Sequence, residues 1–99
     1  MNDTDASGPA DGSMDTRRKR MLFRSWHRGT REMDMLLGKF AEQHIGTFTD
    51  QQLDRFDGIL AENDLDIYNW LSGRAPVPED LRHDVMGLLR NFTLSVRHY

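Results

Sequence analysis

Apolar residues recur along most of this chain at the spacing of an α-helix, and no stretch alternates apolar and polar residues as a strand would. The pattern predicts a first helix from about Thr16 to Trp26, which Gly29 ends. A second helix is expected to begin at Thr30 and to stop at Gly46. Its apolar residues form one wide stripe, made of Met33, Leu36, Leu37, Phe40, Ala41, His44 and Ile45.

Three further helices are predicted in the second half of the chain. Thr49 and Gln52 have the spacing of a capping box, which marks the start of the third helix. Asp64 is expected to cap a short fourth helix that Gly73 ends. Pro78 suits the first position of the last helix, whose predicted buried stripe contains Leu81, Val85, Leu88, Leu89, Phe92 and Val96. The sequence therefore predicts an all-α fold, a small five-helix bundle in a single domain.

The length of 99 residues suits one small domain, which we place at residues 16–99. Residues 1–15 are acidic and nearly free of large apolar side chains, so we expect a disordered tail there. This tail has the features of neither a signal peptide nor a transit peptide. No apolar run reaches the length of a membrane span, and there is no cysteine. These observations favour a cytoplasmic protein without membrane insertion.

Charge is unevenly distributed along the chain. Residues 16–40 hold eight basic and two acidic side chains, a net charge of +6, whereas residues 50–84 hold three basic and nine acidic ones, a net charge of −6. The basic run from Arg17 to Arg20 has two interpretations. It is a solvated first helical turn, or it binds a partner such as a nucleic acid, because positive charge opposes the dipole at a helix N-terminus. The slightly acidic chain lacks the base-reading side chains of a recognition helix, which disfavours nucleic acid.

No constellation of catalytic or metal-binding residues is visible in the sequence. The four histidines are scattered without an i, i+4 pair, so no metal site is expected; they are His27, His44, His83 and His98. There is no nucleophile motif and no phosphate-binding loop, so we expect neither catalytic residues nor a bound cofactor, and the chain is not expected to be an enzyme. Tyr68 and Trp70 are more typical of packing residues than of a stacking platform.

The segment from Arg28 to Glu32 is the most informative part of the sequence. Gly29 stands between two basic residues where two helical patterns meet, which indicates an exposed turn that another surface can approach closely. Arg28 and Glu32 either pair with each other across the turn or face outward and pair with a partner.

Two segments carry a resemblance to a known family. The first runs from Arg20 to Leu37 and contains an Arg-Gly-x-x-Glu motif, with a Leu-aromatic pair and a serine upstream and Asp-x-Leu-Leu downstream. The second, from Asp64 to Leu71, reads Asp-x-Asp-aliphatic-aromatic-x-Trp-Leu. Over about residues 16–92 the chain resembles the succinate dehydrogenase assembly factor 2 family, whose bacterial members are called the flavinator or FAD assembly factor.

The resemblance implies a specific function. Members of that family are small helical bundles that bind the flavoprotein subunit of succinate dehydrogenase, and in bacteria that of the related fumarate reductase. They promote covalent attachment of FAD to a histidine of that subunit. The motif assigns partner binding to Arg28, Gly29 and Glu32, with Arg20 and Asp34 as supports.

Because nothing in the sequence could catalyse flavin chemistry, we expect a chaperone-like mechanism in which FAD is the cofactor of the partner. The sequence gives no reason to expect an obligate oligomer, so we expect a monomer. The acidic tail is not expected to matter for this activity. The alternative function is a small basic-helix nucleic-acid-binding or regulatory protein that uses residues 17–24, which predicts steeply salt-dependent binding.

Overall fold

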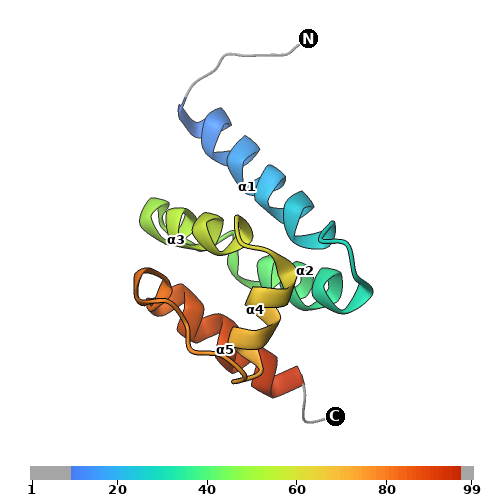
Figure 1. The fold of residues 1–99 in the computed structure, drawn as a ribbon. Coiled ribbons are helices and arrows are strands. Elements are labelled where there is room, and N and C mark those ends of the chain that lie inside the picture. Colours follow the sequence, from blue (N-terminus) through green and yellow to red (C-terminus); the bar gives the residue numbers. More distant parts are fainter. Residues whose placement is uncertain (1–9, 97–99) are drawn as a thin grey trace.

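Five α-helices and one short 3₁₀ helix make up the part of the chain that the structure describes (Figure 1). The structure is a computed structural model that describes residues 10–96, with side chains from residue 14 onward. The elements are α1 (Ala10–Trp26), α2 (Arg31–His44), α3 (Asp50–Leu60), α4 (Asp64–Leu71), η1 (Glu79–Leu81) and α5 (Asp84–Val96). The predicted all-α, five-helix fold is confirmed over these residues.

The first helix is longer than the sequence pattern predicted. α1 begins at Ala10 and not near Thr16, so residues 10–15 are helical and not part of a disordered tail. Met14 packs against the core, which supplies an apolar contact for the added turns. The rest of the proposed tail, residues 1–9, lies outside the described residues. Figure 1 shows the first turns of α1 projecting beyond the other helices, while its last turns lie against α2.

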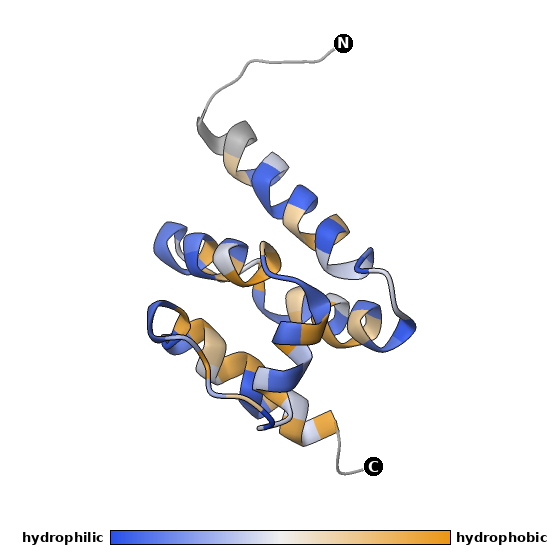
Figure 2. Cartoon of the chain, viewed as in Figure 1, coloured by the Kyte–Doolittle hydropathy of each residue, from blue (hydrophilic) through white to orange (hydrophobic). Residues whose placement is uncertain are grey.

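The core lies between all five α-helices: α2, α3, α4 and α5 supply most of it, and Met21 of α1 is also buried in it. Figure 2 shows how apolar and polar residues alternate along these helices. Phe40 of α2 is fully buried near its centre, with ring centroids 5.5 Å from Phe56 and 5.8 Å from Phe92. Trp70 is also buried, which confirms it as a packing residue, whereas Tyr68 is 39% exposed.

Local capping signals place the starts and ends of α3 and α4. The capping box predicted at Thr49 and Gln52 is confirmed, because each side chain bonds the backbone of the other residue. Asn63, and not Asp64, caps α4: its side chain accepts a hydrogen bond from the backbone N–H of Asp66 at 2.9 Å. Gly73 follows α4 with φ +81°, as expected for a glycine that ends a helix.

The last helix differs from the prediction in its start and in its buried face. Pro78 precedes the 3₁₀ helix η1, and α5 begins only at Asp84. The helix starts there because the His83 ring caps it, with Nδ1 accepting from the backbone N–H of Met86 at 3.1 Å. Leu88 is exposed, and Met86 and Thr93 are buried instead. Thr93 tolerates burial because its hydroxyl donates to the Leu89 carbonyl at 2.8 Å.

Candidate partner-binding site at the turn between α1 and α2

Residues 27–30, called here the α1–α2 turn, have a backbone that requires glycine. Gly29 has φ +124°, a conformation that side-chain-bearing residues rarely adopt. Space is not the constraint, since a Cβ at this position would come no closer than 4.0 Å to Asp64 Oδ2. Thr30 then caps α2 by accepting from the backbone N–H of Met33 at 3.3 Å. The predicted turn is therefore confirmed, and the structure requires glycine there for its backbone conformation.

Arg28 points inward, which corrects both interpretations of its side chain. Its guanidinium donates from Nε to Asp64 at 2.9 Å, and from the two terminal nitrogens to the carbonyls of Leu60 and Glu62, each at 2.9 Å. Only 10% of the side chain is exposed. The carbonyls at the end of α3 lack helical partners and carry the negative end of the helix dipole, so they attract this cation. Arg28 therefore neither pairs with Glu32 nor faces outward toward a partner, and it joins the turn to the segment between α3 and α4.

Asp34, in the first turn of α2, supports the same turn from the other side. Its Oδ1 accepts hydrogen bonds from the backbone N–H groups of Arg28 and, at 3.3 Å, of Gly29. A carboxylate in this position also complements the positive end of the α2 dipole. Asp34 therefore holds the turn from the side of α2, and its predicted role in partner binding stays a prediction.

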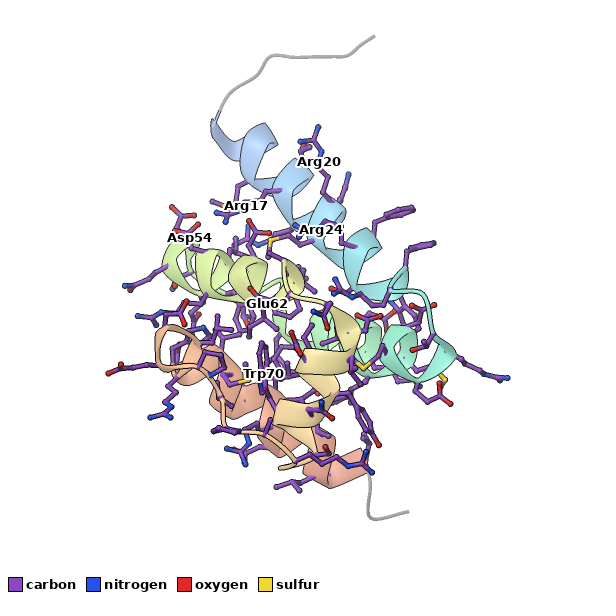
Figure 3. The ribbon with its side chains drawn as sticks, in the orientation of Figure 1. Arg17, Arg20, Arg24, Asp54, Glu62 and Trp70 are labelled. Atoms are coloured by element: carbon purple, nitrogen blue, oxygen red, sulfur yellow. The ribbon has the colours of Figure 1, made fainter. Side chains whose placement is uncertain are left out.

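Glu32 and Arg20 are both exposed, but they lie in different places. Glu32 is in the first turn of α2, beside the turn, and no hydrogen bond or ion pair joins its carboxylate to another described residue. Arg20 lies eight residues before Arg28 and extends away from the bundle in Figure 3. The structure therefore groups Arg28, Gly29, Glu32 and Asp34 at the turn and leaves Arg20 on the outer face of α1.

A shallow open hollow of about 640 Å³ lies over the turn. It is lined by the two helix ends and the turn itself: Trp26, His27, Gly29, Thr30, Arg31, Asp34 and Met35. Phe23 stacks on the His27 ring beside it, with centroids 3.9 Å apart, yet remains 62% exposed. Met35 of α2, which also lines this hollow, is 42% exposed. Exposed aromatic and apolar side chains flanking a polar turn are the composition of a protein-binding surface.

Sequence reasoning missed one pair that positions this site. A Cβ on Gly38 would lie 2.2 Å from Cδ2 of Trp26, so the indole rests directly on the α2 backbone. The Trp26 Nε1 also donates to Glu42 at 3.0 Å. The contact fixes the end of α1 against α2 and hence the start of the turn. A glycine in the middle of a strong helical stripe was the signal available in the sequence.

Two of the four residues in the basic run from Arg17 to Arg20, and Arg24 beyond it, contact other parts of the molecule. Arg17 pairs with Asp54 of α3 at 2.6 Å, and Arg24 pairs with Asp57. The labels in Figure 3 locate Arg17 and Asp54 on neighbouring helices. Arg18 donates to two backbone carbonyls beyond the end of α2, at 3.0 and 2.9 Å. Because α1 begins at Ala10, these arginines are not in its first turn, and the dipole argument for an external anion no longer applies.

Within residues 10–96, no group of three His, Asp or Glu side chains is arranged to hold a metal ion. Across the same residues, no helix is long and apolar enough to cross a bilayer.

Comparison with known proteins identifies the family. Residues 19–93 match the family model described as flavinator of succinate dehydrogenase. The chain is 43% identical over 75 residues to the FAD assembly factor SdhE of Acetobacter pasteurianus, covering 76% of this chain and 69% of that protein. It is 40% identical over 86 residues to the mitochondrial succinate dehydrogenase assembly factor 2 of Danio rerio, covering 85% of this chain and 54% of that protein.

A relative in Candida glabrata, also named mitochondrial succinate dehydrogenase assembly factor 2, is 36% identical over 85 residues, which cover 82% of this chain and 56% of that protein. The chain thus spans about half the length of these two mitochondrial relatives. The family model covers most of the chain and includes the entire α1–α2 turn. The chain therefore belongs to the family of succinate dehydrogenase flavinators.

Proposed function

We propose that this chain is an assembly factor that binds the flavoprotein subunit of succinate dehydrogenase and promotes covalent attachment of FAD to that subunit. Its relatives are named as succinate dehydrogenase and FAD assembly factors. The observation that carries the proposal is the α1–α2 turn. It is exposed, held from within by Arg28 and Asp34, and flanked by the carboxylate of Glu32, which pairs with no other residue in the part of the chain that the structure describes. The related flavoprotein of fumarate reductase is a second substrate for the same surface.

A chaperone mechanism follows from this arrangement. A turn that is already rigid loses little conformational entropy when it docks, so more of its contact energy is available to hold the partner. Glu32 supplies a charge-assisted hydrogen bond to the partner, and the hollow beside Gly29 admits the partner backbone closely. The docked flavoprotein is held with its histidine and flavin oriented for bond formation. The bond forms in the partner, and FAD belongs to the partner. In this proposal the chain acts as a monomer in the cytoplasm.

Co-expression of the flavoprotein subunit with and without this chain tests the proposal. We expect flavin that stays with the acid-precipitated subunit to rise when the wild-type chain is present. Replacing Glu32→Gln is expected to raise the off-rate about tenfold or more and to lower covalent flavin, without changing the melting temperature. Glu79→Gln on η1 is the matched control, because it makes the same exposed charge change at another place.

Two outcomes would contradict the proposal at different levels. Equal covalent flavin with and without the chain would refute the assembly function. Wild-type flavin content with Glu32→Gln would instead show that docking does not use the α1–α2 turn.

A further inference from the structure

A second hollow, of about 680 Å³, lies between α2, α4 and α5; we call it the α2–α5 groove. Its floor and walls are mainly apolar and include Met35, Leu36, Tyr68, Phe92 and Val96. On α2 the groove lies beside the face that packs into the core, and Leu36 borders both. Its α2 residues follow helical spacing along one stripe: Glu32, Met35, Leu36, Lys39 and Gln43.

The groove is continuous with the turn that the proposed function uses. Met35 lines both hollows, and Glu32, the last residue of the Arg-Gly-x-x-Glu motif, lines the groove. A partner that contacts both Gly29 and Glu32 therefore passes over Met35 and reaches the start of the groove.

The charges along the groove have a defined order. Glu32 and Lys39 are separated by seven residues of α2, which is about 10 Å along the helix. Both side chains are exposed, and neither pairs with another described residue. Met35 and Leu36 lie between them. The surface thus presents a carboxylate, an apolar stretch and an ammonium group in line.

We propose that the α2–α5 groove receives an amphipathic segment of the flavoprotein subunit. This segment carries a basic residue opposite Glu32, an acidic residue opposite Lys39, and apolar side chains between them that fill the hollow. The inference rests on the proposed function, because it takes the same partner. A second copy of this chain fits less well: two identical hollows facing each other would enclose unfilled space, which sacrifices dispersion contacts.

Photo-crosslinking identifies the occupant directly. The photoreactive amino acid p-benzoylphenylalanine is placed at Gln43, which is exposed and lines the groove. As a control it is placed at Lys19 on α1, which is also exposed but does not line the groove. With the purified flavoprotein subunit, we expect the Gln43 probe to crosslink to a flavoprotein peptide with the predicted basic, apolar and acidic order. The Lys19 probe should give no crosslink to that peptide. A Gln43 crosslink to a second copy of the chain, or to residues 97–99 of the same chain, would overturn the proposal.

Charge reversal tests the assigned complementarity. Lys39→Glu is expected to weaken binding to the purified flavoprotein subunit about tenfold, with the difference shrinking as salt increases. Lys19→Glu should change the affinity less than twofold. Unchanged affinity for Lys39→Glu, while the wild-type chain binds and raises covalent flavin, would refute the groove and leave the proposed function standing. If the wild-type chain neither binds the subunit nor raises its covalent flavin, the proposed function itself fails.

Discussion

Replacing Arg28→Ala is expected to destabilise the fold by about 3 kcal/mol, because the guanidinium is a structural link and not an exposed contact. The side chain is only 10% exposed and Asp64 is 21% exposed, so solvent screens the pair only partly. Each of the two bonds to carbonyls contributes about 1 kcal/mol, and the charge-assisted bond to Asp64 contributes roughly 1–2 kcal/mol. Their sum is a large share of the roughly 5–15 kcal/mol that stabilises a domain.

Urea unfolding followed by far-UV circular dichroism measures this loss. Arg28→Lys keeps the charge, but its donors sit on one nitrogen and cannot copy the planar fork that reaches three separate acceptors. We therefore expect about two of the three bonds to be lost, at a cost of about 2 kcal/mol. Asp64→Asn removes only the ionic part of one bond and should cost about 1 kcal/mol. The double variant Arg28→Ala with Asp64→Asn completes a double-mutant cycle, and its coupling energy reports the Arg28–Asp64 interaction alone.

Binding to the flavoprotein subunit, measured where each variant is still folded, separates the two possible roles of Arg28. We expect affinity to fall in step with stability across Arg28→Lys and Arg28→Ala, because both loosen the turn. The reasoning is refuted if Arg28→Ala unfolds at the same urea concentration as the wild type while its affinity for the partner collapses. That result would mean that the guanidinium contacts the partner directly.

Two further predictions concern the packing and the capping of the bundle. Gly38→Ala should lower the free energy of unfolding by about 1–3 kcal/mol, because the added methyl group collides with Trp26. The control Gly87→Ala has open space around the new methyl group and should be neutral or stabilising. A Gly38→Ala variant as stable as the wild type in thermal melts would contradict the close contact between Trp26 and the α2 backbone. Burial lowers the pKa of His83 below its ordinary value of 6.5. The neutral ring therefore stabilises the fold fully above about pH 6.5, and this stabilisation is lost as the pH falls below that value. It is lost because protonation of Nδ1 removes the acceptor for the Met86 N–H. Unfolding free energies measured from about pH 8 to pH 5 should fall less steeply for His83→Asn than for the wild type, and parallel curves would contradict the assignment.

Features that depend on neighbours in sequence were predictable. The capping box at Thr49 and Gln52 and the glycine that ends α4 both follow from interactions within a few residues, and both are confirmed. The true cap of α5 is a local feature that was missed, since histidine is not a usual capping residue and Pro78 gave a stronger but misleading signal.

Features that depend on distant contacts were not predictable. The direction of Arg28 is set by acceptors more than thirty residues away, at the end of α3, in the connection after it and at the start of α4, and no spacing rule reports such a pairing. The sequence therefore located the turn and its motif, while only the three-dimensional structure distinguishes the inward arginine from the outward glutamate.

This distinction divides the Arg-Gly-x-x-Glu motif into a part that builds the turn and a part that meets the partner. Arg28 and Gly29 build the turn: the first through its bonds to the α3–α4 connection, the second through its backbone conformation. Glu32 is exposed and unpaired within the described residues, so its contribution to stability is small. Variants of the first two should therefore lose affinity and stability together, whereas Glu32 variants should lose affinity alone. A plot of affinity against unfolding free energy would separate them, and a Glu32 variant on the line of the Arg28 variants would contradict this division.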